Sequence, residues 1–249
     1  MRGDWVRIVV PTLLRREELE LEAEISVGST AEAVWLGRSF DDSRWVAKKP
    51  LLGESELLAE LVGWLLARAI EAPVPSGCGL WEDEQGEWWA LSRFVEDASH
   101  WTPSKDPSRV RNLEAIGLLL AVDGILWNED RHAKNILVAN RDDCAVGIDF
   151  GAALVGHPPS LQSRGIAAPP RRRQDLVVEL ALARPSVAAG VGDGALRLAR
   201  LDEREIAAIA AASTKQVCPT MKDLLQQVLE DRCRAAHDCN ADLLGESAR

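Results

Sequence analysis

Residues 130–135 read Asp-Arg-His-Ala-Lys-Asn, and residues 149–151, a short segment later, read Asp-Phe-Gly. Phosphoryl transfer from a nucleotide needs an oxygen acceptor near the attacking hydroxyl and oxygen ligands for Mg²⁺, because the enzyme contributes mainly positioning and electrostatic stabilisation. Asp130, Asn135 and Asp149 are residues of these types. Either motif alone would fit an acidic loop or an ordinary turn, but the two together predict a kinase.

The segment between the two motifs predicts a β-hairpin. Residues 136–139 and 145–148 are short apolar runs, and the turn formers Asn-Arg-Asp-Asp at 140–143 separate them. Paired strands lie about 5 Å apart, and Mg²⁺ holds its oxygen ligands at about 2.1 Å. A hairpin folded at this turn would set Asn135 opposite Asp149, so that a single ion could bind both side chains.

Residues 128–137, followed by 148–151, resemble the HipA-like branch of the atypical kinases, which is related to the phosphatidylinositol 3/4-kinase catalytic core. The order Asp-Arg-His at 130–132, in place of the His-Arg-Asp of ordinary protein kinases, separates these groups. Residues 45–48 resemble the nucleotide-binding lysine strand of the HipA-like domain, and residues 60–75 resemble its next helix and the following loop. The resemblance covers about residues 24 to 240.

The resemblance implies an α+β, protein-kinase-like fold with two lobes. A small β-rich N-lobe is expected over residues 1–95 and a mainly helical C-lobe over residues 96–249, with ATP bound between them. A chain of 249 residues can bury a substantial core. One catalytic domain fits this length better than two independent domains.

The implied function is ATP- and Mg²⁺-dependent transfer of the γ-phosphate to a hydroxyl. A HipA-like relative suggests a protein serine/threonine kinase linked to a bacterial toxin–antitoxin or growth-control system, and in the first case a partner antitoxin. Two alternatives remain open: a phosphotransferase for a small molecule such as an antibiotic or metabolite, and a nucleotide-binding regulatory module with little turnover. The sequence carries no general code for the acceptor, so the expected partners are ATP and an unidentified protein or small-molecule hydroxyl.

Individual roles follow for the residues of the two motifs. Asp130 is the expected catalytic base or the residue that orients the acceptor hydroxyl, whereas Asn135 and Asp149 are the expected Mg²⁺ ligands. His132 is a further catalytic candidate. His132 and Arg131 either brace the loop or touch phosphate, or they only pack and hydrogen-bond to the backbone.

A kinase also needs a lysine that contacts the phosphates and a helix carboxylate that holds this lysine. Lys48 and Lys49 are the only lysines before residue 100, and strand alternation allows only one of them to face the cleft. The HipA-like resemblance favours Lys48, whereas the ordinary kinase strand motif read literally favours Lys49. Glu60 is the expected partner of the lysine, and Glu54 and Glu56 are expected to be solvated.

Further residues are expected to contact the nucleotide. Residues 27–30, Val-Gly-Ser-Thr, occupy the phosphate-loop position, but they lack the repeated glycines of a protein-kinase loop, so a simple turn is the alternative. Residues 94–97 are the expected link between the lobes, where backbone groups could meet the adenine. The expected nucleotide contacts, besides Lys48 and Glu60, are Gly28, Ser29, Val46, Phe94, Glu96 and Leu137.

The helix before the catalytic loop has a recognisable start. Asp106 followed by Pro107 predicts a capped helix with proline at its first position, running toward Trp127. Asp123 on this helix is expected to be structural, and Asn128 is expected to orient the loop. The helix would deliver the catalytic loop to the active site.

Periodicity and turn signals predict the remaining elements. Strands are expected at 6–10, within 19–49 and at 88–94. Helices are expected from a cap at Ser55, over 174–184, and after caps at Asp202 and Thr220.

The formal net charge is −10 and the pI is near 5.0, which argue against general binding to nucleic-acid phosphates or anionic lipid. The first residues lack the apolar core of a signal peptide, and no apolar run approaches the roughly 20 residues that span a bilayer. Five cysteines without a Cys-x-x-Cys pair suit reduced thiols. We therefore expect a cytoplasmic protein without a membrane partner.

Overall fold

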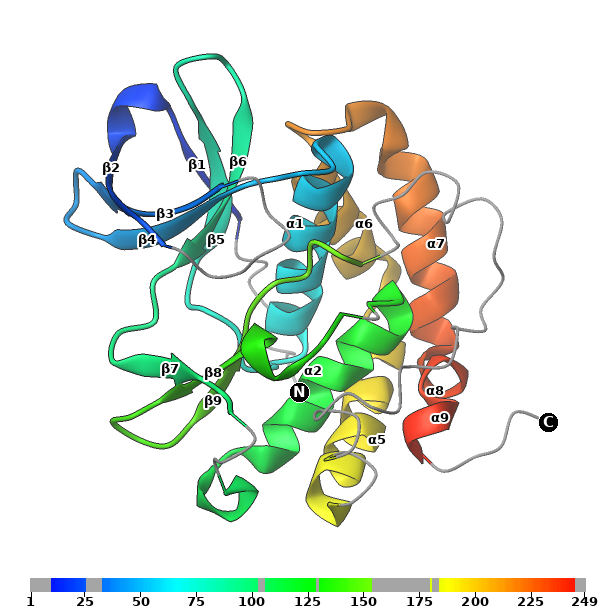
Figure 1. Cartoon of the computed structure of the whole chain (residues 1–249). Helices are drawn as coiled ribbons and strands as arrows, with labels where there is room; N and C mark the ends of the chain where they lie inside the picture. The colour runs from blue at the N-terminus through cyan, green and yellow to red at the C-terminus, as the bar shows by residue number, and fades with distance from the viewer. Residues whose placement is uncertain are drawn as a thin grey trace, which may run out of the picture.

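The computed structural model describes residues 10–25, 33–102, 106–128, 130–153, 180 and 184–244. It has a mixed α+β architecture, as expected. A six-stranded sheet lies at one end of the molecule, most helices lie at the other, and helix α1 lies between them (Figure 1).

The six-stranded sheet is built from the first part of the chain, and its strand order is β1-β5-β6-β4-β3-β2. β1 pairs with β5 in parallel, and the other neighbours are antiparallel. The predicted strands within 19–49 and at 88–94 are confirmed, whereas β5 was not predicted. The strands are β1 (Thr12–Leu14), β2 (Leu19–Glu24), β3 (Ala33–Ser39), β4 (Arg44–Lys49), β5 (Cys78–Glu82) and β6 (Trp88–Arg93).

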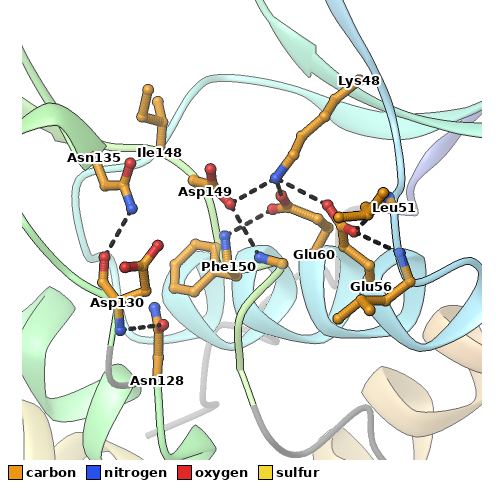
Figure 2. A network of polar contacts seen from close by, with 12 residues as sticks. Lys48, Leu51, Glu56, Glu60, Asn128, Asp130, Asn135, Ile148, Asp149 and Phe150 are labelled. Carbon is orange, nitrogen blue, oxygen red and sulfur yellow. Dashed lines mark hydrogen bonds and ion pairs between the residues drawn. The ribbon is translucent and has the colours of Figure 1, made fainter. Parts of the chain in front are cut away.

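The two faces of this sheet carry different side chains because successive residues of a strand point to opposite faces. On β4, Trp45 and Ala47 are buried in a cluster with Trp89 on the face away from α1. Lys48 points to the other face, toward α1 (Figure 2). The alternation of β4 therefore directs one lysine toward the centre of the molecule.

Helix α1 (Glu54–Ala69) packs its apolar residues against the sheet and the C-terminal helices. Its N-cap is Gly53, at a φ of 62°, so the predicted cap at Ser55 is wrong by two residues. The side chain of Glu56, the third helical residue, reaches back to accept from the amides of Leu51 and Leu52 and so joins the preceding segment to a first turn that starts before Ser55.

The segment after Asp106 differs from the prediction. The Asp106 carboxylate accepts from the amide of Ser108 at 2.9 Å, but it caps only the 3-10 turn Pro107–Arg109. Helix α2 (Leu113–Leu126) begins after a break and is apolar almost all round, because it is buried on nearly every side. It ends at Leu126, and its C-cap Trp127, at a φ of 56°, turns the chain into the loop that carries residues 130–135.

The C-terminal part of the structure is helical. Asp202 caps its helix with a capping box that includes Glu205, as predicted. Thr220 is not a cap; it lies in the 3-10 turn Pro219–Met221. The helices are α5 (Pro185–Ala199), which was not predicted, α6 (Glu203–Thr214), α7 (Lys222–Arg234), α8 (Ala236–Cys239) and α9 (Ala241–Leu244).

The predicted hairpin is confirmed as β8 (Ile136–Ala139) and β9 (Ala145–Gly147), and β7 (Ala98–His100) pairs with β8 to complete a three-stranded sheet. The predicted helix at 174–184 and the strand at 6–10 lie outside the described residues, apart from Val10, Leu180 and Arg184. Within the described ranges, every helix is too short or too polar to cross a membrane.

Candidate active site

The loop after α2 is closed by its own hydrogen bonds. The side-chain amide of Asn135 donates to the backbone oxygen of Asp130 at 2.8 Å, and the amide of His132 donates to the same oxygen at 2.9 Å. The backbone amide of Asp130 donates to Asn128 Oδ1 at 3.3 Å (Figure 2). These bonds use the backbone of Asp130, and its carboxylate takes no part in them.

Arg131 and Asp123 form a buried ion pair behind this loop. Nε of Arg131 lies 2.9 Å from Asp123 Oδ2, and Nη2 lies 3.1 Å from Oδ1. Asn128 donates to the same carboxylate at 2.8 Å. Nη1 of Arg131 donates to the backbone oxygens of Asn135 and Ile148. Arg131 therefore braces the two motifs against each other, and at 3% exposure it is too deep to reach a phosphate.

Asp123→Ala should be strongly destabilising, by about 3–5 kcal/mol, because it leaves the buried Arg131 without a counter-charge. Chemical denaturation measures the change in the free energy of unfolding. The control is Asp193→Ala, which removes a half-exposed partner of Arg197 and should cost no more than about 1 kcal/mol. Equal losses in the two variants would contradict the bracing role.

Lys48 is surrounded by carboxylates. Its Nζ lies 2.8 Å from Asp149 Oδ1, 3.2 Å from Glu60 Oε1 and 3.1 Å from Glu56 Oε1 (Figure 2). Lys49 points to the other face of β4 and pairs with Glu87 at 2.8 Å. The structure thus brings Lys48, and not Lys49, together with Glu60 and the Asp-Phe-Gly segment.

Glu60 connects Lys48 to the second motif, since its Oε2 accepts from the backbone amide of Phe150 at 2.8 Å. Burial raises the pKa of Glu60 to about 7, although Lys48 opposes the shift. Burial alone would lower the pKa of Lys48, but Glu60, Asp149 and Glu56 outweigh it and raise this pKa. In Asp149, Lys48 outweighs the effect of burial and lowers the pKa of the carboxyl group.

The sequence predicted that Asp149 lies opposite Asn135 in the hairpin, and this prediction is wrong. The amide of Ile148 donates to the backbone oxygen of Asn135 at 2.9 Å, so Ile148 is the residue that pairs with it. Asp149 follows the ladder at a φ of 66°, in the left-handed region. This conformation turns its carboxylate toward Lys48.

Phe150 anchors the second motif to helix α1. Its ring is buried, and Arg131 stacks over it with 4.7 Å between the guanidinium carbon and the ring centroid. The ring packs directly on Gly63, where a side chain of any size would collide with it. Phe150 therefore holds the helix that carries Glu60 against the segment that carries Asp149.

Asp130 and His132 lie on the more open side of the loop. Their side chains are 45% and 42% exposed, and His132 Nε2 is 3.9 Å from Asp130 Oδ2. Both side chains are open enough to meet an acceptor. Among the described residues, the ion pairs of Lys48 are with Glu56, Glu60 and Asp149, and not with Asp130.

The structure describes some of the expected nucleotide contacts but not all of them. Val46 lies two residues before Lys48 on β4 and so shares its face, and Leu137 is half-buried on β8. Phe94 and Glu96 both contact Arg44, which stacks on the Phe94 ring at 4.4 Å and lies 3.1 Å from Glu96 Oε2. The expected phosphate loop with Gly28 and Ser29 lies outside the described residues.

Two residues of the site were not recognised in the sequence. Glu56, which we expected to be solvated, is buried and contacts Lys48. Its spacing of four residues from Glu60 places both on one helix face, which is the signal that could have identified it. Arg44 carries no comparable signal, because its partners lie 50 or more residues away.

The donor set suits a hard divalent cation. Among the described residues no group of three His, Cys, Asp or Glu side chains could hold a metal ion. The candidate ligands are instead one carboxylate, Asp149, and one amide oxygen, Asn135, in surroundings where three carboxylates face a single ammonium. Mg²⁺ accepts such a sparse protein shell, because phosphate and water complete its coordination.

A scan against protein-family models finds no match, and a search of curated proteins also finds none. The HipA-like resemblance is therefore not established. Among solved structures, the chain is similar to the Helicobacter pylori proinflammatory kinase CtkA, with a TM-score of 0.58 and 13% sequence identity. The alignment covers 95% of this chain and 100% of that kinase. At this identity the similarity shows the fold alone, and that fold is kinase-like.

Proposed function

We propose that the chain is an ATP- and Mg²⁺-dependent kinase that transfers the γ-phosphate to a hydroxyl of a protein serine or threonine. The observation that carries the proposal is the cluster in which Lys48 Nζ lies 3.2 Å from Glu60 and 2.8 Å from Asp149. Three separate segments supply these groups: strand β4, helix α1 and the Asp-Phe-Gly segment, which lies 101 residues after Lys48. A purely structural ion pair would need only two of these three charged side chains.

The proposed roles follow from the positions of the side chains. Lys48 contacts the phosphates of ATP, and Glu60 holds Lys48. Asn135 and Asp149 would hold Mg²⁺, which supplies charge neutralisation at the phosphates. Asp130 accepts the proton of the acceptor hydroxyl. At the same time the hydroxyl oxygen bonds to the γ-phosphorus, and the bond between this phosphorus and ADP breaks.

We further propose that the kinase is two-lobed, with residues 1–95 and 96–249 as the N-lobe and C-lobe of one domain and ATP between them. The Asp-Arg-His order at 130–132 favours a HipA-like kinase. That assignment brings with it a protein acceptor, a cytoplasmic toxin–antitoxin system and a partner antitoxin.

The test is phosphate transfer from γ-labelled ATP, with Mg²⁺, into a whole-cell lysate that is then separated into protein and small molecules. Label on protein, on serine or threonine, is the expected result. Label on a small molecule would instead identify a small-molecule phosphotransferase. Nucleotide binding without transfer to either fraction would identify a regulatory module and contradict the proposal.

Lys48→Met should abolish transfer, whereas Lys49→Met should stay near wild-type activity. The reason is that Lys49 faces away from the cluster and contacts Glu87 and the ring of Trp89. Transfer rates of both variants, measured at equal folded concentration, check the prediction. If Lys49→Met were inactive and Lys48→Met active, the prediction would be wrong. Every side chain of β4 would then have to be assigned to the opposite face of the sheet.

A further inference from the structure

Glu56 is the second acidic residue of α1 in contact with Lys48. Its Oε1 lies 3.1 Å from Lys48 Nζ, and the two side chains are 7% and 12% exposed. A carboxylate at this depth is unfavourable unless it is paired and hydrogen-bonded. Glu56 therefore belongs to the lysine cluster and not to the solvated face of the helix.

The other oxygen of Glu56 binds the segment that connects β4 to α1. Oε2 accepts from the amide of Leu51 at 2.9 Å (Figure 2) and from the amide of Leu52 at 3.2 Å. One carboxylate thus joins the lysine, the connection after the lysine strand and the first turn of α1. The Lys48 ammonium and the Leu51 and Leu52 amides thus give this buried carboxylate the partners that it needs.

Gly151 packs directly against this pair. A methyl group at this position would lie 2.8 Å from Glu56 Cγ and 3.0 Å from both Glu56 Oε1 and Lys48 Nζ. Only a residue without a side chain leaves this space. The glycine of the Asp-Phe-Gly segment therefore leaves room for the two atoms that form the Lys48–Glu56 contact.

We propose that Glu56 is a positioning residue that, together with Glu60, holds the Lys48 ammonium in place for the phosphates of ATP. Asp149, the third partner of the lysine, is also the proposed metal ligand. Once the Asp149 carboxylate binds a cation, Glu56 and Glu60 remain as two anchors on one face of α1. Two anchors restrict a flexible four-carbon side chain that one anchor would leave freer to move. This inference rests on the proposed function.

The link between Glu56 and Lys48 is tested without nucleotide by a double-mutant cycle. Glu56→Gln keeps an oxygen for the Leu51 and Leu52 amides but removes the charge. In the wild type this substitution removes a charge pair, whereas in Lys48→Met it removes a carboxylate that has already lost its partner. Its effect on the equilibrium constant of unfolding should therefore be more favourable to the folded state in Lys48→Met, by a factor of about 5. Glu54→Gln, on the exposed side of the same turn, should act equally in both backgrounds. Lys48→Gln replaces Lys48→Met if that variant does not fold.

The positioning role is tested by calorimetry with two ligands. Adenosine lacks the phosphates and does not need Lys48, whereas Mg-ATP does. Glu56→Gln should weaken Mg-ATP binding about tenfold, the size expected for one charge-assisted contact, and leave adenosine binding unchanged. Glu54→Gln should change neither affinity.

The outcomes separate this inference from the proposed function. Wild-type protein that fails to bind Mg-ATP would refute the proposed function and, with it, the role of Glu56. If the wild type binds Mg-ATP, three results for Glu56→Gln would overturn this inference alone. The variant could bind Mg-ATP as tightly as the wild type, or it could lose as much affinity for adenosine as for Mg-ATP. It could also show no coupling to Lys48 in the double-mutant cycle.

Discussion

Asp149→Ala should abolish both phosphate transfer and the stabilisation of the protein by Mg-ATP. Asp149 is the only carboxylate that is both in the Asp-Phe-Gly segment and in contact with Lys48, at 2.8 Å. A ligand at a hundredfold excess over its Kd stabilises the folded state by about 2.7 kcal/mol, so the melting temperature with and without Mg-ATP is a sensitive measurement.

The substitution itself should not unfold the protein. It removes one of three carboxylates around a single ammonium, and Lys48 keeps Glu56 and Glu60 as partners. The control is Asp142→Ala in the turn of the same hairpin, where the side chain is exposed and should leave the Mg-ATP shift intact. An undiminished shift in Asp149→Ala would refute its role as a metal ligand.

Asp130→Asn should keep its affinity for ATP while losing most of kcat. The hydrogen bonds that close the loop use the backbone of Asp130, so asparagine preserves them while removing the base. General bases and orienting groups contribute about 10²- to 10⁴-fold, and a loss of this size should lower kcat and kcat/KM together.

ATP affinity and turnover measured on the same preparation decide the role of Asp130. Wild-type turnover would make Asp130 purely structural. Intact turnover with weakened ATP binding would move it into the nucleotide site. Asp143→Asn, in the hairpin turn, is the matched control and should alter neither quantity.

The elements that the sequence predicted well are those with a local cause. The hairpin around residues 140–143 was predictable because apolar runs and turn formers lie next to each other in the chain. The capping box at Asp202 and Glu205 was predictable because its two reciprocal hydrogen bonds span only three residues. Strand alternation made Lys48 and Lys49 mutually exclusive candidates for the cluster, although it did not choose between them.

The elements that the sequence did not predict depend on distant partners. Helix α5 contains three glycines, which disfavour a helix in isolation, and it forms where it packs against the buried helix α2. Strand β5 includes Gly79, which lies in close contact with Thr12 of β1 and so needs its neighbour to be present. Packing overrides weak local propensity at both places.

The sequence by itself determined which residues could carry phosphoryl chemistry, since Asp130, Asn135 and Asp149 are recognisable by type and spacing. Only the tertiary structure decided that Lys48 contacts Asp149 and that Glu56 is buried beside this lysine. The physical reason is that a charged side chain is indistinguishable from a solvated one until segments far apart in the chain exclude water from it.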